Sequence, residues 1–70
     1  MITIKQSKKR TETCQEDQGQ IKFTGSLQVC EIDLPTTKEY IWSSTDKTYD
    51  LTTNDSSLSL EEIEKILQSF

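Results

Sequence analysis

Residues 39–44, EYIWSS, and residues 48–53, TYDLTT, are two short segments rich in β-branched and aromatic side chains, separated by a polar triplet at 45–47. Such side chains favour strands, and a short polar linker between two strand-like segments is typical of a β-hairpin. Because side chains alternate across a strand, Tyr40 and Trp42 share one face of the first arm, and Tyr49 and Leu51 share one face of the second. An antiparallel pair therefore forms the centre of the predicted fold.

The C-terminal segment carries the start signals of a helix. Ser59 is the expected N-cap, and Glu62 completes a capping box three residues later. Leu58 and Ile63 occupy the two positions of a hydrophobic staple. A helix of about ten residues is marginal alone in water, so its apolar stripe must lie on the sheet. That stripe consists of Leu60, Ile63, Ile66, Leu67 and Phe70.

Three further segments alternate apolar and polar residues. Ile21, Phe23 and Val29 share one parity, whereas Ile32 has the other. A change of parity flips the buried face of a strand, so we expect a turn at residues 25–26 or a bulge at residues 30–31. The prediction is a single small α+β domain over residues 1–70, an antiparallel sheet of four to five strands with one C-terminal helix packed on one face. Its elements are strands over about 2–8, 21–24, 27–34, 39–44 and 48–53, a helix over about 59–69, and a mobile loop over about 9–20.

Charge is distributed unevenly along this small acidic protein of net charge −4. The first ten residues hold four basic side chains and no acid, whereas residues 11–70 hold all 12 acidic residues against four lysines. The hydrophobic fraction, 31%, predicts a thin core. The chain lacks an apolar run long enough to span a bilayer and has no signal-like start, so the expected location is cytoplasmic.

Cys14 and Cys30 are the only cysteines, and the sequence contains no histidine. Without an export signal, the favoured interpretation is two reduced thiols, with Cys30 buried as a small hydrophobe. A disulfide is the alternative. A metal site is disfavoured because the spacing matches no compact zinc motif, so we expect neither metal nor cofactor.

Catalysis is not expected from this composition. Histidine, the side chain best suited to general base chemistry at neutral pH, is missing, and a cysteine nucleophile would lack its usual base. The two glycines do not form a phosphate-binding loop. We therefore expect a protein that acts by binding.

The main functional hypothesis is a non-catalytic protein-binding module of regulatory or inhibitory type. The acidic C-terminal part would suit a partner with a basic or groove-like surface, as in an inhibitor of a host protein encoded by a phage or mobile element. In the alternative interpretation the acids only confer solubility and Trp42 is the centre of the core. The candidate contact residues are Tyr40, Trp42, Asp46, Tyr49, Asp50 and Glu64.

Two alternatives belong to other classes. Lys8, Lys9 and Arg10 could contact nucleic-acid phosphates, although nucleic acid is the less favoured partner. The chain could also be a small structural subunit of a larger assembly. A homodimer is a further hypothesis, because the first strand or residues 48–53 could offer an exposed sheet edge for pairing.

Overall fold

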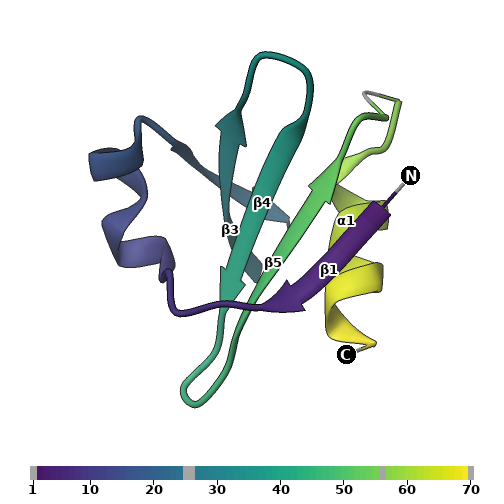
Figure 1. Ribbon diagram of the computed structural model, residues 1–70. Coiled ribbons are helices and arrows are strands. Elements are labelled where there is room, and N and C mark those ends of the chain that lie inside the picture. The colour runs from purple at the N-terminus through teal and green to yellow at the C-terminus, as the bar shows by residue number, and fades with distance from the viewer. Residues whose placement is uncertain (1, 25–26, 56, 70) are drawn as a thin grey trace.

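A computed structural model describes residues 2–24, 27–55 and 57–69 of the chain. Five strands, a short 3₁₀ helix (η1) and one α-helix follow one another within these ranges (Figure 1). Their bounds are β1 Ile2–Gln6, η1 Thr11–Asp17, β2 Gln20–Thr24, β3 Leu27–Asp33, β4 Lys38–Ser43, β5 Thr48–Thr53 and α1 Leu60–Gln68.

The strands form one antiparallel sheet in the order β1-β5-β4-β3-β2. Strands β2 to β5 follow one another as a meander, and β1 returns to pair with β5 (Figure 1). The predicted fold class, an α+β fold with an antiparallel sheet and a C-terminal helix, is confirmed. The edges of the sheet are β1 and β2. The prediction that residues 48–53 could offer an edge is wrong, because β5 lies between β1 and β4.

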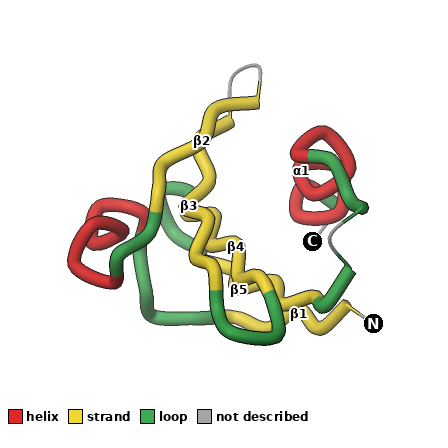
Figure 2. The backbone as a smooth tube through the Cα atoms, turned by 90° about the horizontal axis from the view of Figure 1, so that it is seen from above, coloured by secondary structure: helices red, strands yellow, loops and turns green. Residues whose placement is uncertain are grey.

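One face of the sheet is covered by α1 (Figure 2). Tyr40 lies opposite Leu51 in the β4–β5 register, and both belong to the core that the helix covers. The rings of Trp42 and Tyr49 stack beside this core, 6.1 Å apart and 8° from parallel. The aromatic face of the hairpin is therefore the face under the helix. The buried members of this core are Val29, Tyr40, Leu51, Ile63 and Leu67.

The opposite face is covered by η1, which the sequence did not reveal. Cys14 of η1 forms a disulfide with Cys30 of β3, and both sulfurs lie in a second buried cluster with Ile32 and Ile41. The prediction that both cysteines are reduced thiols is therefore wrong for this structure. The segment predicted as a loop over 9–20 contains a 3₁₀ helix tied to the sheet. Close packing explains Gly19, since a Cβ there would lie 2.6 and 2.7 Å from the two sulfurs.

Two-sided coverage also explains the change of parity along β3. Val29 faces α1, whereas Cys30 and Ile32 face η1, so both parities are buried. The β3 register runs without interruption against β2 and β4, and the bulge considered at residues 30–31 is absent from these paired residues. The alternative position for the change, residues 25–26, lies outside the described residues.

The start of α1 is fixed by the predicted capping box. The backbone N–H of Glu62 donates to Ser59 Oγ at 3.2 Å, and the N–H of Ser59 donates to Glu62 Oε1 at 3.4 Å. Leu58 packs against the same core as Ile63, as a hydrophobic staple requires. Neither helix of the described ranges has the length and apolar character that a membrane span needs.

We expect Ser59→Ala to lower the free energy of unfolding by about 0.5–2 kcal/mol, because the backbone N–H of Glu62 loses its acceptor, Ser59 Oγ. Ser59→Asp should retain most of the stability, since aspartate also caps helices well. Urea denaturation followed by circular dichroism measures both. Equal stability of the wild type and Ser59→Ala would show that the cap does not hold α1 on the sheet.

Candidate functional site

An open groove of about 840 Å³ lies between β2 and α1. It combines exposed Phe23 with the polar side of the helix, and its two walls come from elements that are distant in the sequence (Figure 2). The residues that line it are Phe23, Ser59, Leu60, Glu61, Glu64, Lys65 and Gln68.

The groove exists because α1 packs on only part of the curved sheet. Ile63 and Leu67, the buried residues of the helix, pack into the core formed by β3, β4 and β5. The edge strand β2 has no buried residue in that core. In Figure 2, β2 lies at the end of the sheet opposite β1. Its backbone approaches that of α1, but its side chains do not join the core under the helix, and the groove lies between the two elements.

Phe23 is the most exposed large apolar side chain of the described residues, with 72% of its surface accessible. Single exposed apolar residues are common and need no function. Phe23 differs because it lies on an edge strand beside a groove. Complete burial of such a ring would release about 2–3 kcal/mol of hydrophobic free energy.

The helix wall of the groove is mainly acidic. It presents the carboxylates of Glu61 and Glu64 against the single ammonium of Lys65. Gln68 Nε2 donates to Glu64 Oε1 at 3.3 Å, and Leu60 is half-buried beside the core. The groove therefore offers apolar surface at Phe23 and Leu60 together with an excess of negative charge.

Of the six residues predicted as partner contacts, Glu64 lies in this groove. Tyr40 is buried in the core, and Trp42 and Tyr49 are half-buried against it. Burial, together with the nearby carboxylate of Glu31, raises the pKa of the Tyr40 hydroxyl. Asp46 is exposed in the β4–β5 turn, where Ser44 Oγ donates to its Oδ1 at 3.3 Å. The structure does not bring the six residues to one surface.

Asp50, predicted as a contact residue and therefore as exposed, is only 4% exposed, so the expected exposure is wrong. Strand alternation places it on the η1 face of the sheet, the face opposite Tyr49 and Leu51. Burial, followed by a hydrogen bond and charge repulsion from Glu39, raises the pKa of Asp50 to about 6. Its Oδ1 is buried without a hydrogen-bond partner.

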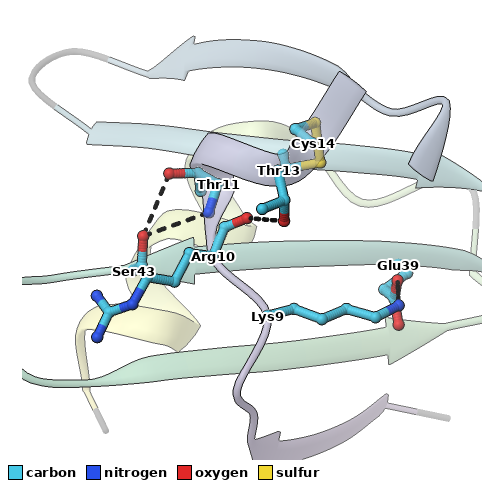
Figure 3. The surroundings of a disulfide bond; sticks show 8 residues. Lys9, Arg10, Thr11, Thr13, Cys14, Glu39 and Ser43 are labelled. Atoms are coloured by element: carbon cyan, nitrogen blue, oxygen red, sulfur yellow. Dashed lines mark hydrogen bonds and ion pairs between the residues drawn. A yellow bond between two sulfur atoms is a disulfide. The ribbon is translucent and has the colours of Figure 1, made fainter. Parts of the chain in front are cut away.

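The basic segment joins β1 to η1 across the same face (Figure 3). Lys9 Nζ lies 3.5 Å from Glu39 Oε1, and Arg10 Nη1 donates to the Ser44 carbonyl at 3.4 Å. Thr11 holds the start of η1 on β4 through contacts of 3.2 and 3.5 Å with Ser43 Oγ. Lys9 and Arg10 thus connect this segment to the sheet, whereas Lys8 is exposed. These three residues are the predicted alternative phosphate contacts.

A second hollow, of about 410 Å³, is formed by the β3–β4 turn around Pro35 and by Asn54. Its rim carries an ion pair of 3.8 Å between Lys38 and Asp33 and the partly exposed side chain of Leu34. Turn residues form most of this hollow, and its two charged side chains pair with each other. It offers a ligand less than the β2–α1 groove does.

The described residues contain no group of three or more cysteine, aspartate or glutamate side chains placed to hold a metal ion. Comparisons with protein-family models, with curated proteins and with solved structures find no match to this chain. Among the features of the groove, sequence reasoning missed Phe23, Leu60 and Glu61 as contact residues. Phe23 has the sequence parity of core residue Val29, but the β2–β3 register pairs Phe23 with Gln28, so the two side chains lie on opposite faces of the sheet.

Proposed function

We propose that this chain is a non-catalytic protein-binding module of regulatory or inhibitory type, and that it binds its partner in the groove between β2 and α1. The observation that carries the proposal is the exposed ring of Phe23 beside that groove. Aromatic residues, Phe included, are enriched in the cores of protein interfaces, where a few anchor side chains supply most of the binding energy.

The charge of the groove supports a basic partner. Glu61 and Glu64 outnumber Lys65 on the helix wall, and the whole chain carries a net charge of −4. Complementary charge speeds association and excludes acidic competitors, whereas apolar contacts supply most of the affinity. The expected partner segment therefore joins apolar and basic side chains. Its binding should weaken as salt is added.

Phe23→Ala should weaken partner binding by about tenfold to a hundredfold, which corresponds to losing about 1.4–2.8 kcal/mol of contact energy. The partner is first identified by affinity capture and mass spectrometry, and is then titrated in purified form by calorimetry. Leu34→Ala is the matched control, because Leu34 is also exposed but lies at the β3–β4 turn. Both variants should melt like the wild type, within about 0.5 kcal/mol.

Equal affinity of the wild type and Phe23→Ala for the purified partner would contradict the proposal. The nucleic-acid hypothesis makes a different prediction. Under it, gel-shift assays at low salt would show retention of DNA or RNA that is lost when Lys8, Lys9 and Arg10 are all changed to Ala. Lys9 and Arg10 already contact Glu39 and Ser44, so binding phosphates would compete with those contacts.

The cytoplasmic location expected from the sequence stays a prediction. Disulfides persist mainly in oxidising compartments, and the Cys14–Cys30 bond is a feature that such a compartment would preserve. Alkylation of the protein in freshly lysed source cells, followed by mass spectrometry without reductant, measures the oxidised fraction directly.

A further inference from the structure

Strand β2 is an edge of the sheet that no element of the described chain covers. Its five residues, 20–24, pair with β3 on one side. Among the described residues, no other element forms a backbone hydrogen bond with this strand. Because strand N–H and C=O groups point alternately to both sides, β2 presents a row of donors and acceptors to solvent.

The other edge, β1, has different surroundings. The hollow beside its Thr3 is only about 190 Å³ and is lined by threonines and Asn54. A lysine stands on each edge strand, Lys5 on β1 and Lys22 on β2, so the edges differ in the hollows beside them. The groove with an exposed aromatic ring follows β2. The two edges are therefore not equivalent as docking sites.

An added strand would fit the shape of the groove. The sheet curves around α1, and β2 forms the end of the curve away from β1 (Figure 2). A sixth strand placed about 4.8 Å beyond β2 would continue this curve over the open side of the helix. It would pair with the free edge of β2, with one set of side chains toward Leu60 and the other set beside Phe23 on the opposite face.

The side chains of such a strand would meet two different environments, one on each face of the sheet. Alternate residues would point toward α1, where Leu60 offers apolar surface and Glu61 and Glu64 offer carboxylates. Basic side chains on the α1 face, alternating with apolar side chains beside Ile21 and Phe23 on the other face, match this arrangement. Lys22 is the basic side chain of β2 that shares the α1 face. Main-chain hydrogen bonds would supply affinity, and these alternate side chains would supply specificity.

We propose that the groove binds an extended segment of a partner protein, with alternating apolar and basic side chains, that adds to the sheet as a strand beside β2. This inference rests on the proposed function, because it specifies how the same groove is occupied. A second copy of this chain is the competing occupant, and the experiment distinguishes the two.

A library of displayed random peptides is the probe, selected against the intact, oxidised protein. We expect enrichment of peptides that alternate apolar and basic residues. The double variant Glu61→Gln/Glu64→Gln should weaken the best peptide by about threefold to tenfold. The matched control Glu12→Gln/Glu16→Gln removes the same charge from exposed positions on η1 and should change affinity less than twofold. Failure to enrich any peptide overturns the inference.

N-methylation of the best peptide tests the mode of binding. In a strand beside β2, every second peptide N–H donates to the sheet. Methylating N–H groups of one parity should weaken binding about tenfold or more, whereas methylating the other parity should change it less than twofold. Loss of binding in Phe23→Ala without any parity effect would leave the groove function standing and overturn strand addition.

Two further outcomes complete the test. Binding unchanged by Phe23→Ala would remove the groove function itself and the strand with it. Sedimentation of the free protein at rising concentration should show a monomer. A dimer whose formation protects the amides of residues 20–24 from hydrogen exchange would identify a second copy as the occupant and overturn the inference.

Discussion

Reduction of the Cys14–Cys30 disulfide is expected to lower the free energy of unfolding by about 2–5 kcal/mol, the largest effect that any single change should have on this fold. The bond joins residues separated by 16 positions, a loop for which the loss of chain entropy in the unfolded state is worth about 3 kcal/mol. A single core in a domain of about 70 residues rarely supplies more than about 3–5 kcal/mol. Reduced protein should therefore be largely unfolded at about 37 °C.

The second buried cluster makes the bond more than a simple cross-link. Cys14 and Cys30 are 2% and 0% exposed, and they pack with Ile32 and Ile41 under η1. Without the bond, η1 would be held to the sheet by polar contacts such as those between Thr11 and Ser43. Such contacts contribute about 1 kcal/mol each. Reduction should therefore also expose the η1 face of the sheet.

Thermal melting followed by circular dichroism, with and without a phosphine reductant, measures this effect. The control is the double variant Cys14→Ser/Cys30→Ser, which should melt at the low temperature of the reduced wild type and ignore the reductant. Identical melting of oxidised and reduced wild type would show that the disulfide does not stabilise the fold. Alkylation of both thiols without reductant would show that the bond is absent in solution.

The elements predicted well from the sequence are those that local chemistry determines. The capping box at Ser59 and Glu62 depends on residues three positions apart, and the structure contains it. The hairpin between β4 and β5 needs only strand-forming residues and a short polar linker. Neither feature depends on where the rest of the chain goes, so a short window of sequence is sufficient to predict it.

The features that sequence reasoning missed depend on contacts between distant segments. The pairing of Cys14 with Cys30 becomes visible only when η1 is placed on the second face of the sheet. One signal was available in the two parities along β3, because apolar residues on both faces of a strand indicate that both faces are covered. Ile41, opposite in parity to Tyr40 and Trp42, carries the same signal on β4.

The candidate site was harder to predict for the same reason. Phe23 has the sequence parity of Val29, yet the β2–β3 register pairs Phe23 with Gln28 and Lys22 with Val29, so Phe23 lies on the η1 face at the edge of the sheet. Phe23 is exposed because the buried cluster under η1 includes Ile21 of this strand but does not extend to Phe23. Strand order and helix placement are tertiary properties, and alternation within one short strand does not determine them.

Asp50→Asn is expected to stabilise the folded protein at pH 7 by about 1–3 kcal/mol. The reason is linkage between protonation and folding. The pKa of Asp50 is about 6 in the folded protein and 3.8 in the unfolded chain, so the folded state loses stability as the pH rises. Between these two values the folded state binds more protons than the unfolded state. The free energy of unfolding should therefore fall as the pH is raised from about 4 to 7.

The environment of Asp50 gives this expectation its physical basis. The carboxyl group is buried on the η1 face, one oxygen lacks a partner, and Glu39 shares a hydrogen bond with it. Lys5 and Lys9 act in the opposite direction and lower the pKa, but burial and Glu39 prevail. Asparagine has the shape of a protonated aspartate and still donates to Glu39. The variant thus removes the buried charge without removing the contact.

Denaturation by urea at several values from pH 4 to pH 7 tests the prediction. The wild type should lose stability across this range through Asp50, and Asp50→Asn should show a flatter profile, with the two proteins nearly equal at pH 4. Asp46→Asn is the matched control, since Asp46 is exposed in the β4–β5 turn and its change should leave the profile close to that of the wild type. Lower stability of Asp50→Asn than of the wild type at pH 7 would contradict the assignment. It would mean that the ionised carboxylate, held by Lys5 and Lys9, is the form that the fold requires.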